Sequence, residues 1–130
     1  MDPVIHFEMP YEDAARAANF YGTAFGWQTQ ALGPQMSNYI VANTCEVTGG
    51  RPARPGAING GLFEKTPDST AQHPSVVIAV ADIHASMEKV ERAGGTVLGE
   101  PMDIPGIGAY VSFLDTEGNR AAMLQPLPQP

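Results

Sequence analysis

The sequence predicts an α+β protein made of two tandem β-α-β-β-β modules, forming a curved, incompletely closed sheet with the helices on its outer face. Two observations support this prediction. A strand followed by a helix occurs twice, near residue 4 and near residue 75, and three strand-like runs follow each helix. We therefore expect modules at residues 1–66 and 67–130 that form one compact structural unit. A ferredoxin-like domain is the competing α+β fold, but three strands after each helix argue against it.

The first module begins with a strand whose apolar residues alternate with polar ones, Val4–Met9. Glu12 and Asp13 open an alanine-rich helix that ends in aromatic residues, and Gly26 is a natural C-terminal cap. Turn-forming glycines and prolines then separate three strand-like runs: Trp27–Leu32, Met36–Asn43 and Ala57–Glu64.

The second module repeats this order from the strand at Ser75–Val80. Asp82 is the expected N-cap of a helix that ends at Gly94-Gly95, and its apolar face recurs at spacings of four and seven residues: Ile83, Met87 and Val90. The strand-like runs after it are Thr96–Leu98, Ile107–Leu114 and Asn119–Gln125. The two halves thus have the same order of elements.

Alternation along the first strand of each module predicts which side chains face away from its helix. Ile5, Phe7 and Met9 form the helix-facing set, so His6 and Glu8 point to the opposite face of the sheet. In the second module this opposite face includes Ser75. A face that mixes polar and apolar residues favours a lined pocket over open solvent, so we expect a ligand there.

Composition excludes several classes of function. The chain has 130 residues, 43% of them hydrophobic, and a net charge of -7 with only seven scattered Lys and Arg. This balance argues against nucleic acid or an anionic membrane surface as a partner. The sequence has neither a run of about 20 apolar residues nor an N-terminal signal pattern, and a single Cys45 rules out an internal disulfide. A cytoplasmic location is the default expectation.

Four segments resemble the vicinal-oxygen-chelate superfamily, which contains glyoxalase I, bleomycin-resistance proteins, fosfomycin-resistance proteins and extradiol dioxygenases. They are His6-Phe7-Glu8, the stretch 19–27, Asn59-Gly60-Gly61-Leu62 and 115–119. The resemblance covers nearly the whole chain and is nearest to a glyoxalase-like subgroup with the Asn-Gly-Gly motif. It implies the two-module fold and a homodimer, but it does not identify an activity.

The resemblance also implies where a metal would be bound. Members that use a metal place ligands on the first and last strands of each module, which here are His6, Gly61, Ser75 and Ala122. Only His6 is a competent ligand, whereas a catalytic metal needs about three. The glutamate that would act as a base in a glyoxalase-type isomerisation is Ala122. We therefore expect no metal or other cofactor and no ordinary glyoxalase I activity.

A metal site could be rebuilt from other residues. His6, Glu8 and His73 would form a two-histidine, one-carboxylate set if their strands lay side by side. The simpler interpretation is that His73 is solvated in a connection, and it is preferred because a set assembled from alternation alone is often false.

The leading hypothesis is therefore a metal-independent, small-molecule binding protein with a glyoxalase-like fold. Its expected ligand-binding residues are His6, Glu8, Tyr39, Ser75, Tyr110 and Ala122, where Tyr39 and Tyr110 occupy matching places in the two modules. The alternative is a lyase or isomerase in which Glu8 and His6 are catalytic acid-base groups, with or without a non-standard metal. A third hypothesis is an association module. The Gly60-Gly61 pair indicates either a close approach by backbone or ligand, or a strand bulge.

Overall fold

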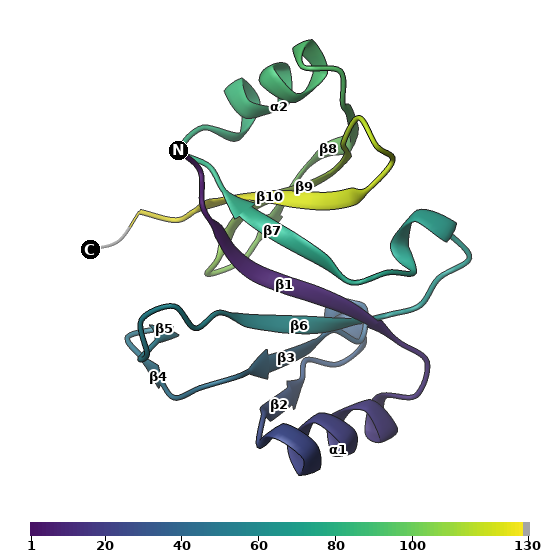
Figure 1. The fold of residues 1–130 in the computed structure, drawn as a ribbon, viewed down its shortest axis with the longest axis vertical. Helices are drawn as coiled ribbons and strands as arrows, with labels where there is room; N and C mark the ends of the chain where they lie inside the picture. Colours follow the sequence, from purple (N-terminus) through teal and green to yellow (C-terminus); the bar gives the residue numbers. More distant parts are fainter. Residues whose placement is uncertain (129–130) are drawn as a thin grey trace. The chain divides into compact units, whose positions relative to one another are not determined.

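The computed structural model describes residues 1–128, which fall into two compact units (Figure 1). One unit, here the N-terminal module, is His6–Pro74. The other, the C-terminal module, joins Met1–Ile5 to the described part of Ser75–Pro130. The division expected between residues 66 and 67 stays a prediction.

The N-terminal module contains a mixed sheet with the strand order β2-β3-β6-β1. Strand β1 is parallel to β6, and β3 is antiparallel to both β6 and β2. Its main elements are α1 (Ala14–Phe25), β2 (Gln28–Ala31), β3 (Ile40–Asn43), β6 (Asn59–Glu64) and β1 (Val4–Tyr11), whose first two residues belong to the other unit. Short elements complete it: the 3-10 turns Pro34–Met36 and Ser69–Ala71, and the strands β4 (Val47–Thr48) and β5 (Arg51–Pro52).

The C-terminal module repeats the arrangement with the strand order β7-β10-β9-β8. Strand β7 is parallel to β10, while β9 is antiparallel to β10 and to β8. Its elements are β7 (Ser75–Ala79), α2 (Ile83–Arg92), β8 (Thr96–Ile104), β9 (Gly108–Leu114) and β10 (Arg120–Pro126). The α+β class and the two β-α-β-β-β modules are therefore confirmed.

The structure differs from the sequence-based prediction at three places. The strand expected from Met36 begins only at Ile40, because the preceding residues form a 3-10 turn. The β4–β5 hairpin was not expected. Strand β8 continues to Ile104, beyond the predicted end at Leu98, because the pairing with β9 shifts between Leu98 and Met102. Gly99, at φ 95°, supplies the left-handed backbone for this bulge.

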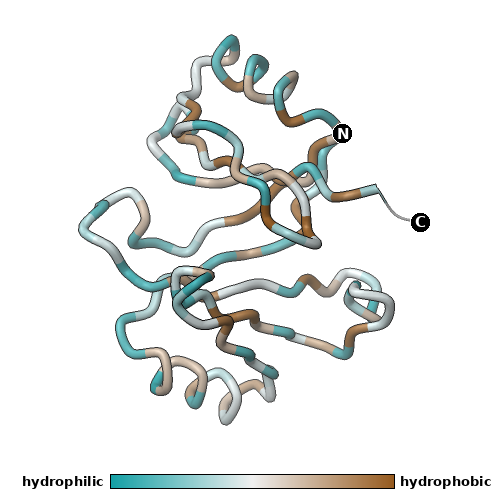
Figure 2. Tube along the Cα trace, turned by 180° about the vertical axis from the view of Figure 1, so that it is seen from behind, coloured by the Kyte–Doolittle hydropathy of each residue, from teal (hydrophilic) through white to brown (hydrophobic). Residues whose placement is uncertain are grey.

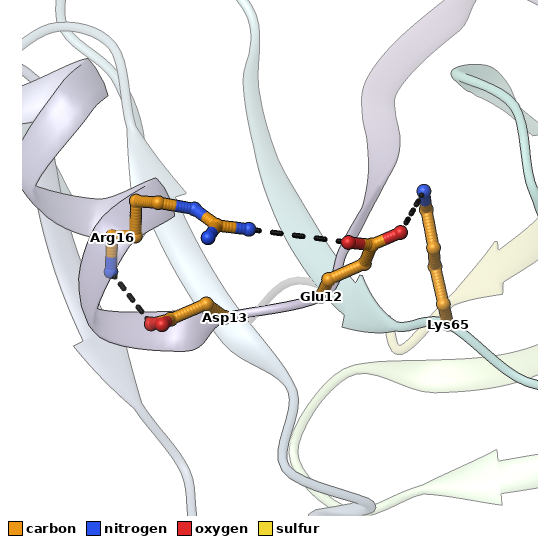
Figure 3. Close-up of polar contacts among 4 residues, drawn as sticks. All are labelled: Glu12, Asp13, Arg16 and Lys65. Atoms are coloured by element: carbon orange, nitrogen blue, oxygen red, sulfur yellow. Dashed lines mark hydrogen bonds and ion pairs between the residues drawn. The ribbon is translucent and has the colours of Figure 1, made fainter.

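Helix α1 begins at the N-cap that the sequence predicts (Figure 3). The Asp13 carboxylate accepts a hydrogen bond of 3.0 Å from the backbone N–H of Arg16, which satisfies one of the free donors of the first turn. Beside it, Glu12 lies 3.1 Å from Lys65 and 4.0 Å from Arg16. These hydrogen bonds and ion pairs tie the start of α1 to the end of β6.

Each module has its own apolar core between its helix and one face of its sheet. In the N-terminal module, buried Tyr11, Ile40 and Leu62 pack with Met9 and with two alanines of α1. In the C-terminal module, the buried set is Val80, Ile83, Val111 and Met123. Hydrophobic segments run along the strands in Figure 2, while the helices carry residues of both kinds.

No helix within residues 1–128 is long and apolar enough to cross a membrane.

Candidate functional site

The face of the N-terminal sheet that lies opposite α1 carries the first group of candidate residues. Glu8 pairs with Gly61 across β1 and β6, and Val41 pairs with Gly61 from the other side. His6 is two residues before Glu8 and pairs with Asn59. Since paired residues share a face of a sheet, His6 and Glu8 lie on this face, as strand alternation predicts.

Tyr39 joins this group from the residue immediately before β3. Its hydroxyl oxygen lies 3.1 Å from Nε2 of His6 and is hydrogen-bonded to it, with the donor set by the imidazole tautomer. Both side chains are half-buried. The structure therefore brings together the histidine and the tyrosine that the sequence nominated separately, although they are 33 residues apart in the chain.

The two glycines beside them make room for two aromatic rings, one on each face of the sheet. A Cβ at Gly60 would lie 2.5 Å from the Phe7 ring, on the α1 side. A Cβ at Gly61 would overlap Oη, Cζ and Cε1 of Tyr39, on the opposite side. The pairing of β6 with β1 is continuous through both glycines, so the bulge expected as one interpretation is wrong. The close approach is made by side chains of the chain itself.

Asn59, the first residue of the Asn-Gly-Gly motif, anchors a loop through its side chain. Its Oδ1 accepts a hydrogen bond of 2.8 Å from the backbone N–H of Thr44. The Thr44 hydroxyl in turn donates to the carbonyl of Ile58 at 2.6 Å. These bonds close the loop that leaves β3 and returns to β6. The motif thus combines one loop anchor with two spaces for rings.

The electrostatic state of His6 follows mainly from burial. Desolvation lowers the pKa of His6 below its usual 6.5, while the carboxylate of Glu8 acts in the opposite direction with a smaller effect. At neutral pH the imidazole is therefore neutral, with one ring nitrogen able to donate and the other able to accept a proton. A neutral histidine beside a carboxylate can serve as a hydrogen-bonding group or as a base.

The other three candidates lie in the C-terminal module. Ala122 pairs with Val77 on β7 and with Ser112 on β9, and all three are buried, with exposed fractions of 1%, 1% and 7%. Ser75 and Tyr110, half-buried, share this face by strand alternation. The ligand-binding roles of Ser75, Tyr110 and Ala122 stay predictions.

Sequence reasoning gave no role to Ser112 and Arg120, which lie on the same face of the C-terminal sheet. The guanidinium of Arg120 donates a hydrogen bond of 3.5 Å to the Ser112 hydroxyl. Arg120 is two residues before Ala122 on β10, so strand alternation starting from Ala122 could have found it.

The rebuilt metal set is not formed. His73 is exposed in the segment between Ser69–Ala71 and β7, and residues 1–128 contain no group of three His, Cys, Asp or Glu that could hold a metal ion. The positions implied by the resemblance do not fit a metal either. The side chains at Gly61 and Ala122 offer no metal-donor atom, and the space over Gly61 is filled by Tyr39.

Comparison with known proteins identifies the family to which the chain belongs. The family model of the glyoxalase/bleomycin resistance protein/dioxygenase superfamily matches residues 4–123. The chain belongs to this superfamily. The vicinal-oxygen-chelate fold that the sequence indicates is thereby confirmed.

Individual relatives include a glyoxylase-like domain-containing protein of Didymella fabae, which is 31% identical over 89% of this chain and 88% of its own. CFP32 of Mycobacterium tuberculosis is 37% identical over 54% of this chain, which spans only 27% of CFP32. The anthracycline biosynthesis protein DauV of Streptomyces sp. is 27% identical over 86% of this chain and 42% of its own.

Solved structures show the same fold at low sequence identity. A methylmalonyl-CoA epimerase of Streptomyces coelicolor, in complex with 2-nitronate-propionyl-CoA, superposes with a TM-score of 0.70 at 15% identity, covering 96% of this chain and 97% of its own. The hypothetical protein BH1468 of Bacillus halodurans gives 0.69 at 12% identity, covering 99% of this chain and 97% of its own. At these identities the likeness extends to the fold alone.

Proposed function

We propose that the chain is a small-molecule binding protein that acts without the divalent-metal site common in its superfamily. The observation that supports this proposal is the hydrogen bond between His6 and Tyr39 over Gly61. The one metal-competent position of the four is thus engaged by a phenol. Gly61, another of the four positions, has no side chain, and the Tyr39 side chain fills the space above it.

The chemistry of this face suits a ligand with both polar and planar parts. His6 and Glu8 provide hydrogen-bonding groups, while the Tyr39 ring and Val41 provide apolar surface. Binding sites of this mixed kind fix a ligand by a few polar contacts and bury the rest of it against carbon. The ligand-binding roles of His6, Glu8 and Tyr39 are part of this proposal.

An enzymatic role is the second candidate, and the lowered pKa of His6 favours it. A neutral imidazole next to the Glu8 carboxylate could move a proton in a lyase or isomerase reaction. In this role Glu8 and His6 would be catalytic residues. The two candidates differ in whether the ligand is returned unchanged.

The first experiment is elemental analysis of untagged protein, repeated after dialysis against divalent ions and combined with melting temperatures. Stoichiometric metal with a raised melting temperature would contradict the metal-independent proposal. A thermal-shift screen of the metal-stripped protein then seeks the ligand. The panel includes CoA thioesters and anthracyclines because the names of similar proteins mention them.

A Glu8→Gln variant separates binding from catalysis once a ligand is known. It keeps the shape of the side chain and removes its charge. Retained binding with lost turnover supports the enzymatic candidate. Unchanged turnover removes Glu8 from the mechanism.

We also propose a homodimer and a cytoplasmic location, with no nucleic acid or membrane partner. The net charge of -7 supports the exclusion of polyanions as partners. Sedimentation at micromolar concentration tests the dimer, and a clean monomer would contradict it.

A further inference from the structure

Tyr39 occupies a place on the sheet where an ordinary residue at position 61 would put its own side chain. The end of the ring, from Cε1 through Cζ to Oη, fills the space that a Cβ of Gly61 would take. The ring therefore lies on bare backbone, and its oxygen reaches His6 Nε2 at 3.1 Å. The surroundings of this ring resemble those of a bound phenol, with the flat backbone of Gly61 beneath the ring and His6 as a hydrogen-bonding partner for the oxygen.

The backbone before Tyr39 is held in an unusual conformation. Ser37 and Asn38 both have left-handed backbones, at φ 54° and 58°, although neither is glycine. Such residues cost free energy and persist only where the surroundings hold them. Asn38 is held twice, since its side chain donates to Glu64 at 3.1 Å and its carbonyl accepts from the Tyr11 hydroxyl at 2.6 Å.

Tyr39 follows this strained segment directly in the chain. Strained segments of this kind occur preferentially beside functional sites, and this one leads directly to the candidate face.

We infer that the Tyr39 ring occupies the binding position of a ligand and is displaced when that ligand binds. The ligand is a planar, uncharged ring that bears a hydroxyl or carbonyl oxygen. The inference rests on the proposed function and adds the class of ligand. A ring fits the glycine floor, and an oxygen fits His6, because a neutral imidazole can present either a donor or an acceptor.

The test removes the tyrosine ring and supplies a free one. In Tyr39→Ala, phenol is expected to bind and raise the melting temperature, while benzene is expected to bind roughly fivefold more weakly because it lacks the hydrogen bond to His6. A space vacated by an aromatic side chain can take up a small aromatic molecule. Binding is measured by calorimetry, and the imidazole nitrogen resonances of His6 report contact with the probe.

Two control variants locate the binding position. Tyr39→Phe keeps a ring that a probe must displace, so both probes should bind to it more weakly than to Tyr39→Ala. Adding Gly61→Ala to Tyr39→Ala puts a methyl group on the floor, and phenol binding should fall at least tenfold. Equal binding of phenol and benzene, or phenol binding unaffected by Gly61→Ala, would overturn the inference. So would a folded Tyr39→Ala that binds no phenol.

A second measurement avoids dependence on the folding of Tyr39→Ala. The wild-type chain is labelled with 3-fluorotyrosine, and the Tyr39 fluorine resonance is identified by its absence in Tyr39→Phe. Titration with p-cresol should move this resonance together with the His6 signals. If p-cresol, taken to its solubility limit, leaves Tyr39 unmoved, the inference is wrong. The proposed function fails separately, if no compound of the wild-type screen perturbs His6, Glu8 or Tyr39.

Discussion

Replacing Gly61 with alanine adds a single methyl group, and we expect it to displace Tyr39. The backbone of Gly61 has no positive φ, so alanine is not strained by its own conformation. The cost comes entirely from the space it needs. Two ring carbons of Tyr39 and its hydroxyl oxygen would lie well within 3.0 Å of the new Cβ, an approach that real Cβ atoms essentially never make.

The magnitude follows from what the displaced ring loses. The hydrogen bond to His6 contributes about 1 kcal/mol. Half-burial of an aromatic ring contributes about 1–2 kcal/mol more, and incomplete relaxation of neighbouring atoms adds up to about 1 kcal/mol. We therefore expect Gly61→Ala to lower the free energy of unfolding by about 2–4 kcal/mol, near the upper end for a single substitution.

The assay is a double-mutant cycle in urea with Tyr39→Ala as the second change. In the Tyr39→Ala background the methyl group meets no ring, so Gly61→Ala should cost less than about 0.5 kcal/mol. The coupling between the two positions should therefore exceed about 1.5 kcal/mol. Equal costs in both backgrounds would refute the assignment of the Gly61 space to Tyr39, and so would a Gly61→Ala variant as stable as the wild type.

Three further outcomes are expected. Gly22→Ala should raise the free energy of unfolding by about 0.5–1 kcal/mol, because Gly22 is inside α1 and its nearest neighbour, the Trp27 carbonyl, would lie 3.5 Å from the new Cβ; a loss of stability in the same urea assay would contradict this. Burial lowers the pKa of His6 in the folded state, so the unfolded chain binds the proton first as the pH falls. The stability contributed by neutral His6 is therefore complete above pH 6.5 and is lost as the pH falls through the folded-state pKa. His6→Gln should flatten that part of the pH–stability curve, and an unchanged slope would be the contrary result. Asn59→Ala should increase amide hydrogen exchange at Thr44, whose N–H donates to Asn59, and continued protection would show that another group holds this loop.

Much of the fold could be predicted because its signals are local. Caps and periodicity located α1 and α2, with Asp13 and Asp82 accepting from the first turn of each helix as expected. The predicted ends of strands were less accurate where pairing between strands overrides a local sequence signal. Pro101 remains within β8 because the bulge at Gly99 restores pairing with β9, and no pattern in the residues alone announces that shift.

The sequence by itself determined the α+β class, the repeated module and the residues available for chemistry, because alternation and capping act over a few neighbouring residues. It also determined that His6 and Glu8 share a face. Only the tertiary structure decided that Tyr39 covers Gly61 and binds His6, and that Phe7 covers Gly60 on the opposite side. Those pairings depend on the register between strands distant in the chain, and on a left-handed turn at Ser37 and Asn38 that Asn38's partners hold in place. A pair of glycines looks the same in any sequence, and the side chains that fill the space over them are known only when the chain has folded.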